Sequence, residues 1–235
     1  MRERKEEKEK EEGEAKERGG RAHRAARLTR RDVEALAWLV EQRAATLPQV
    51  GRLLAQLSGE QMSTRRVRQV VARWEQLGLA ERWRVWHGEP AVVCPTVQAA
   101  YMHGLVRWRR PGVGTLRHTV AVTEVRLLAA PINGQRQWIC ESELRRMCPK
   151  GTHLGDGGWW EPDGSAVIVE VELSPHGRRR VSEAIRSHLA ARAGDVRRWA
   201  RVLYVCSERT ITQVEAVVAE LPASDRPRVQ VRALP

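Results

Sequence analysis

The segment of the chain that decides its fold covers residues 159–180 and reads WWEPDGSAVIVEVELSPHGRRR. Its apolar and β-branched run predicts a β-strand over residues 166–173. The Pro-Asp-Gly sequence at 162–164 is typical of a tight turn, so the strand is expected to be the second arm of a β-hairpin. Because side chains alternate between the two faces of a strand, Glu170 and Glu172 should share one face.

The carboxylates of this segment suggest a metal site. Metal-dependent nucleases gather Mg²⁺ ligands from an aspartate near a hairpin and an acidic pair on the following strand, which Asp163 and Glu170 would supply. Mg²⁺ prefers hard oxygen ligands of this kind. Such sites carry a lysine at the end of the acidic triplet, and Glu172 occupies that place. The segment therefore looks like a nuclease core that has lost or moved its catalytic cation.

The length and composition of the chain limit the number of its domains and the kind of protein it can be. A chain of 235 residues forms one large domain or two small ones. It has neither an apolar run of the ~20 residues that span a bilayer nor a signal peptide, so we expect a cytoplasmic protein without a membrane partner. Its four cysteines do not read as a disulfide framework. The spacing of Cys140, Cys148 and His153 matches no compact zinc knuckle, which favours ordinary buried thiols.

The net charge of +12 favours a polyanionic partner. Residues 1–27 contain ten basic and eight acidic groups and no bulky apolar residue beyond Met1, so they predict a disordered, solvated tail. Ten of the twelve excess positive charges therefore belong to the rest of the chain. Arginine dominates there, and its guanidinium binds phosphate oxygens in pairs. Double-stranded DNA is the expected partner.

Residues 28–105 predict a winged helix-turn-helix domain. Thr29 with Asp32 predicts the start of a first helix, and a second begins near Pro48. A third helix runs from Ser63 to Gly78, with an apolar stripe at a spacing of 3.6 residues. The alternating residues 79–94 then predict a β-hairpin, the wing.

The polar face of the third helix would read the DNA major groove, and the wing would reach phosphate or the minor groove. The predicted contacts are Arg65, Arg66, Arg68, Gln69 and Arg73 on the helix, and Arg82 and Arg84 on the wing. The alternative is that these side chains only keep an exposed surface soluble.

Residues 106–114 read as a basic linker, and residues 115–235 as a second domain. Its predicted order of elements is αβββαβαβ, which suggests a mixed sheet flanked by helices. The expected fold class is thus α+β: an N-terminal winged helix-turn-helix followed by a mixed α/β domain.

With these elements in place, the chain resembles the replication-relaxation family of actinobacterial plasmids and integrative elements. The residues that carry the resemblance are LRHTVAVTEV (116–125), PDG (162–164), VIVEVELSPHGRRR (167–180) and RVLYV (201–205), within a match from about residue 28 to 222. It implies that the second domain is similar to the PD-(D/E)xK restriction-endonuclease fold.

The resemblance also assigns site residues. It implies that Asp163 and Glu170 are the metal-binding acids, joined by Glu124 from the first helix of the second domain, with Glu172 in the lysine position. His176, or Arg178 beyond it, is the nearest cationic substitute. The alternative for the acidic residues is that they are relics on a retained scaffold, because a fold does not determine function. His118 on the same helix as Glu124 is interpreted as structural.

The expected function is DNA binding for a mobile element, in plasmid replication, DNA relaxation or mobilisation. Such a role allows three protein partners: a relaxase, a replication initiator or a second copy of the chain. In this interpretation the nuclease-like site is degenerate and needs no cofactor. One alternative is an Mg²⁺-dependent endonuclease that nicks DNA, and another is a winged-helix transcription regulator.

Overall fold

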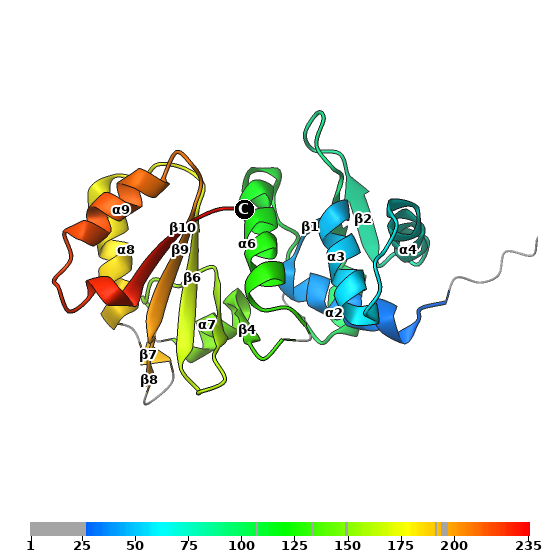
Figure 1. Ribbon diagram of the computed structural model, residues 1–235. Coiled ribbons are helices and arrows are strands. Elements are labelled where there is room, and N and C mark those ends of the chain that lie inside the picture. The colour runs from blue at the N-terminus through cyan, green and yellow to red at the C-terminus, as the bar shows by residue number, and fades with distance from the viewer. Residues whose placement is uncertain (1–26, 107, 133, 149, 191, 194–196) are drawn as a thin grey trace, which may run out of the picture.

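The computed structural model describes residues 27–235, except 107, 133, 149, 191 and 194–196. The predicted charged tail lies, apart from Arg27, outside the described residues. The described chain is α+β. Helices with a small antiparallel sheet come first, and a five-stranded mixed sheet with helices follows (Figure 1).

The N-terminal half contains four helices and a three-stranded sheet. The helices are α2 (Arg30–Gln42), α3 (Leu47–Ser58), α4 (Thr64–Gln76) and α5 (Val97–Met102). The strands are β1 (Ala45–Thr46), β2 (Ala80–Trp83) and β3 (Val92–Pro95), in the antiparallel order β1-β3-β2.

Local sequence determines where these helices begin. Thr29, Thr46 and Ser63 each accept a hydrogen bond from the backbone amide three residues later, which satisfies an amide that has no partner within the helix. The caps predicted at Thr29 and Ser63 are confirmed. The apolar stripe of α4, which includes Val67 and Trp74, is buried against α2 and α3 as its spacing predicts.

The C-terminal half is built on one mixed sheet. Its helices are α6 (Val113–Ala129), α7 (Glu141–Met147), α8 (Arg178–Ala190) and α9 (Ile211–Ala219), with a 3₁₀ turn at Arg226–Arg228. Its strands are β4 (Gln137–Cys140), β5 (Gly157–Trp160), β6 (Ala166–Glu172), β9 (Arg201–Cys206) and β10 (Val229–Ala233). Strands β7 (Arg192–Ala193) and β8 (Arg197–Arg198) form a separate two-stranded pair.

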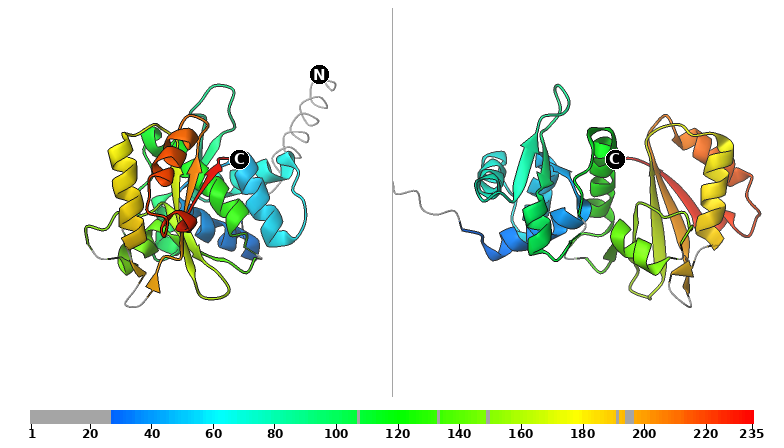
Figure 2. Two further views of the ribbon diagram at one scale, coloured as in Figure 1. Left: turned by 60° about the vertical axis from the view of Figure 1, so that its left-hand side comes forward. Right: turned by 180° about the vertical axis from the view of Figure 1, so that it is seen from behind.

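The five strands run in the order β10-β9-β6-β5-β4. Strands β4, β5 and β6 form an antiparallel meander, whereas β6, β9 and β10 are parallel to one another. Helix α6 covers one face of the sheet, and α8 and α9 cover the other (Figures 1 and 2).

Side chains of β6 alternate between the two faces of the sheet and pack in the core on both faces. Val167, Val169 and Val171 pack in the cluster that includes α6, whereas Ile168 packs in the cluster that includes α8. The even-numbered residues of β6 therefore face α8, and the glutamates at 170 and 172 share that face, as predicted. This alternation places the acidic pair beneath α8.

Helix α6 contacts both halves of the molecule. The hydroxyl of Thr123 donates to the carbonyl of Ala44 at 2.7 Å, while the opposite side of α6 packs on the sheet. The segment predicted as a linker also packs on the N-terminal half: the Trp108 indole donates to the Val40 carbonyl at 3.0 Å, and Arg110 pairs with Glu81. None of the described helices is long and apolar enough to cross a bilayer.

Candidate functional site

The side chain of Glu170 is the centre of a polar cluster on the α8 face of the sheet. Glu170 stands opposite Tyr204 of the neighbouring parallel strand β9. Its side chain is only 15% exposed. A carboxylate so far removed from water needs nearby partners to remain ionised.

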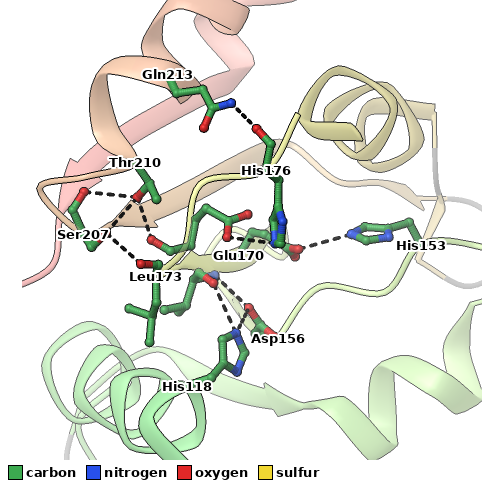
Figure 3. A network of polar contacts seen from close by, with 11 residues as sticks. His118, His153, Asp156, Glu170, Leu173, His176, Ser207, Thr210 and Gln213 are labelled. Carbon is green, nitrogen blue, oxygen red and sulfur yellow. Dashed lines mark hydrogen bonds and ion pairs between the residues drawn. The ribbon is translucent and has the colours of Figure 1, made fainter. Parts of the chain in front are cut away.

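Two histidines supply those partners. His153, in the loop before β5, places Nε2 3.2 Å from Glu170 Oε1 (Figure 3). His188, fully buried on α8, places Nε2 3.3 Å from Glu170 Oε2. That second approach lacks the angular geometry of a hydrogen bond, so among the described residues both nitrogens of His188 and Glu170 Oε2 have no hydrogen-bond partner.

The electrostatics of Glu170 follow from this setting. Burial by itself would raise the pKa of Glu170, but the imidazoles of His153 and His188 outweigh burial and lower it. Conversely, the Glu170 carboxylate raises the pKa of His153 by accepting its hydrogen bond. The Glu170 carboxylate and the His153 imidazole therefore each favour the charged form of the other.

A second pair joins the residue directly before β5 to α6, the helix on the other face of the sheet. Asp156 Oδ2 accepts hydrogen bonds from the Val171 amide at 2.7 Å and from His118 Nε2 at 3.1 Å (Figure 3). His118 Nε2 is also 3.1 Å from the Val171 carbonyl, which can only accept, so Nε2 must carry the hydrogen. The hydrogen bond to Asp156 raises the pKa of His118. Burial raises the pKa of Asp156, which also feels the charge of Glu170.

Glu172 and His176 form a third pair at the end of β6, with Nε2 and Oε1 3.3 Å apart. Burial raises the pKa of Glu172, and the nearby charges of Glu170 and Asp156 add to the effect, whereas His176 opposes it. Both residues predicted from the sequence as members of the site are thus next to Glu170. Neither is a free cation of the kind that the lysine of a nuclease provides.

The structure does not bring Asp163 to Glu170. Asp163 is exposed in the hairpin turn, where its carboxylate accepts from the Ser165 amide at 2.8 Å. Trp160 pairs with Ala166 next to that turn. Glu170 lies four residues farther along β6, roughly 13 Å away at the usual rise of a strand.

Glu124 is also turned away from the cluster. Its carboxylate accepts from Gln49 at 2.9 Å and from Arg52 at 2.6 Å, both on α3 of the N-terminal half. Six residues along a helix separate it from His118, so the two side chains point in different directions. The three residues predicted to bind Mg²⁺ therefore do not converge on one ion.

Comparison with known proteins gave no match. No family model, curated protein or solved structure matches this chain. The resemblance described above is therefore an expectation, and the site is interpreted from its own geometry.

Three members of the cluster were not predicted as site residues: Asp156, His153 and His188. His188 lies seven residues after Val181 and three after Ile185, so the helical periodicity of α8 already places it on the buried face. Asp156 follows Gly155 directly before β5, outside the Pro-Asp-Gly turn and the acidic strand that carry the predicted metal site. Nothing in the sequence around His153 distinguishes it from a surface histidine.

The predicted DNA contacts divide into two groups. Arg65, Arg66, Arg68 and Gln69 are exposed on α4, and Arg84 is exposed beyond β2. Arg73 instead pairs with the buried Asp32, and Arg82 pairs with Glu75 at 2.8 Å. A groove of about 1010 Å³ separates α4 from the β2–β3 connection, and its lining includes four arginines: Arg52, Arg68, Arg82 and Arg84.

Proposed function

We propose that this chain is a DNA-binding protein whose N-terminal half acts as a winged helix-turn-helix. The order of α2, β1, α3, α4, β2 and β3 supports this assignment. In such modules the third helix enters the major groove. Here α4 buries its apolar stripe and leaves its polar face to solvent.

The observation that carries the proposal is the charge on that exposed face. Within the part of the chain that the structure describes, no ion pair involves Arg65, Arg66 or Arg68. Three guanidinium groups without an ion pair, all near the N-terminal end of α4, can contact phosphates or base edges without first breaking such a pair. The arginine-lined groove beside α4 extends this surface toward Arg84.

For the C-terminal half we propose a scaffold similar to the PD-(D/E)xK restriction-endonuclease fold. Its support is the order of elements from α6 to β9: a helix, three antiparallel strands, a helix and a parallel strand, when the short α7 and the separate β7–β8 pair are left out. The acidic cluster on β6 supports it as well. Together with the resemblance, this favours a role in replication, relaxation or mobilisation of a mobile element's DNA.

We infer that this half binds DNA or a partner protein without cleaving phosphodiesters. The residues expected to hold Mg²⁺ do not fit one ion, since Asp163 and Glu124 lie elsewhere, so no catalytic step through Mg²⁺ is derived. The cationic group that a nuclease needs beside its carboxylates is replaced by Glu172. DNA nicking is the alternative, favoured by the closeness of Asp156, Glu170 and Glu172.

Fluorescence anisotropy with a labelled duplex tests the proposal. Replacing Arg65, Arg66 and Arg68 together by Ala should weaken affinity at least tenfold and reduce the slope of log affinity against log salt by about three. The matched control replaces Arg145, Arg146 and Arg186, three exposed arginines of α7 and α8, and removes the same charge. Equal losses in both variants would mean that α4 is not the preferred DNA contact.

A further inference from the structure

We propose that His153, Glu170 and His188 form a binding site for a divalent transition-metal ion of the Zn²⁺ class. One ligand atom from each residue lies within 4.8 Å of the other two. Among the described residues, no other set of three or more histidine, cysteine or acidic side chains comes close enough together to hold an ion. The site shares only Glu170 with the predicted Mg²⁺ ligands, and its donor chemistry differs.

The distances match those around a bound ion. Two ligands about 2.1 Å from a tetrahedral Zn²⁺ are about 3.4 Å apart. The two histidine–glutamate separations are 3.2 Å and 3.3 Å, each to a different oxygen of the Glu170 carboxylate. These spacings fit an ion held by both carboxylate oxygens. The ligand atoms of the two histidines lie within 4.8 Å of each other, so an ion that needs a closer approach requires one ring to turn toward it. His153 can make that adjustment because it is exposed and lies outside the helices and strands.

The hydrogen bonding of His188 is an independent argument. Its ring is fully buried, and Nε2 lies 3.3 Å from Glu170 Oε2, yet within the described part of the chain neither ring nitrogen nor Glu170 Oε2 makes a hydrogen bond. Buried polar atoms without partners are rare, because each one costs the free energy of its lost hydration. An ion between His188 and Glu170 would satisfy one atom of each residue.

The donor set selects the class of metal. Two imidazole nitrogens and one carboxylate oxygen suit Zn²⁺ and its first-row neighbours, whereas Mg²⁺ and Ca²⁺ prefer oxygen ligands alone. The site is also open on one side, since the His153 side chain is 41% exposed. Three protein ligands and a solvent-facing position leave room for a water molecule or a ligand from a partner.

The neighbouring acid–histidine pairs do not compete for this role. His118, on α6, is held by Asp156 and the Val171 carbonyl. His176 is paired with Glu172 at the end of the strand. The proposal is independent of DNA binding by α4, since a metal could organise this half as a structural centre whether or not it contacts DNA.

Calorimetric titration of the chelator-treated full-length chain with Zn²⁺ tests the proposal. We expect one Zn²⁺ per chain, with no competition from millimolar Mg²⁺. The variant His153→Asn should bind Zn²⁺ at least tenfold more weakly, and because His153 is exposed its fold should be retained. Glu170→Gln should have the same effect on Zn²⁺ binding.

Two controls separate this site from other zinc ligands. His87→Asn, in the exposed turn between β2 and β3, should bind Zn²⁺ like the wild type. The double variant Cys140→Ser/Cys148→Ser should also retain binding. The proposal is overturned if the wild type binds no Zn²⁺, if His153→Asn binds it with unchanged affinity, or if the cysteine variant loses it.

Discussion

Arg73 on α4 donates two hydrogen bonds from Nη2 to the carboxylate of Asp32 on α2, at 2.8 Å to Oδ1 and 2.7 Å to Oδ2. Asp32 is fully buried, and it also accepts from the backbone amide and hydroxyl of Thr29 and from the Trp74 indole. An arginine that the sequence assigns to DNA recognition therefore fixes the third helix of the N-terminal half to the start of the first.

Replacing Asp32 by Asn should destabilise the fold by roughly 2–4 kcal/mol at neutral pH, because it leaves the Arg73 charge without its buried partner. Burial alone would raise the pKa of Asp32, but the hydrogen bonds from Thr29 and Arg73 lower it below its usual value. The folded-state pKa is thus below the unfolded one. The carboxylate therefore stabilises fully above pH ~5 and loses its effect as the pH falls through the folded-state value.

Urea unfolding of wild type and Asp32→Asn between pH 7 and pH 3 measures this difference. The gap in unfolding free energy should be constant above pH ~5 and shrink below it. A gap that is unchanged down to pH 3 would show that the carboxylate charge is not what Arg73 recognises.

Single arginine substitutions on α4 should separate stability from DNA affinity. Arg73→Ala should lower the free energy of unfolding by roughly 2–3 kcal/mol, since it leaves a buried carboxylate without its cation. Arg68→Ala should change stability by less than about 0.5 kcal/mol, because the side chain is exposed, but should weaken duplex binding severalfold. Thermal unfolding and anisotropy on the same samples measure both. The reverse pattern would place Arg73 in the DNA contact.

Gly158, on β5 of the hairpin, lies too close to β6 for any larger residue. A Cβ atom added to Gly158 would lie 2.4 Å from the backbone carbonyl oxygen of Val167 on β6, so the strands would have to move apart. Gly158→Ala should destabilise the chain by about 1–3 kcal/mol, the usual cost of overpacking.

Gly114 in the first turn of α6 is the matched control. A Cβ atom there meets nothing within 4 Å, and its φ is not positive. Gly114→Ala should therefore be neutral or stabilising by up to ~1 kcal/mol. Chemical denaturation of both variants tests the pair, and equal losses would show that the cost at Gly158 is not steric.

The purified chain should leave supercoiled plasmid DNA intact in Mg²⁺, because its acidic residues do not assemble the expected ligand set and Glu172 occupies the position where the lysine is expected. Agarose-gel analysis after prolonged incubation provides the measurement. Nicking that persists in Asp163→Asn but disappears in Glu170→Gln would contradict the non-catalytic proposal. It would favour an endonuclease built on Glu170 instead.

The hairpin and the helix starts follow from local chemistry. Thr29 and Ser63 can cap a helix because their hydroxyls reach an amide only three residues away. The strands at Arg201–Cys206 and Ala166–Glu172 follow from runs rich in apolar and β-branched residues. Glu170 and Glu172 share a face because alternation is a property of the backbone itself.

The chain by itself therefore determined the α+β order of elements, the caps, the strands and the shared face of the acidic pair. Only the tertiary structure decided which groups surround Glu170. His153 comes from a loop, His188 from the buried face of α8, and Asp156 from the position directly before β5. Their meeting depends on the register between β5 and β6 and on how α8 packs across the sheet. These are long-range relationships that no local spacing encodes, and they leave Asp163 at the far end of the hairpin.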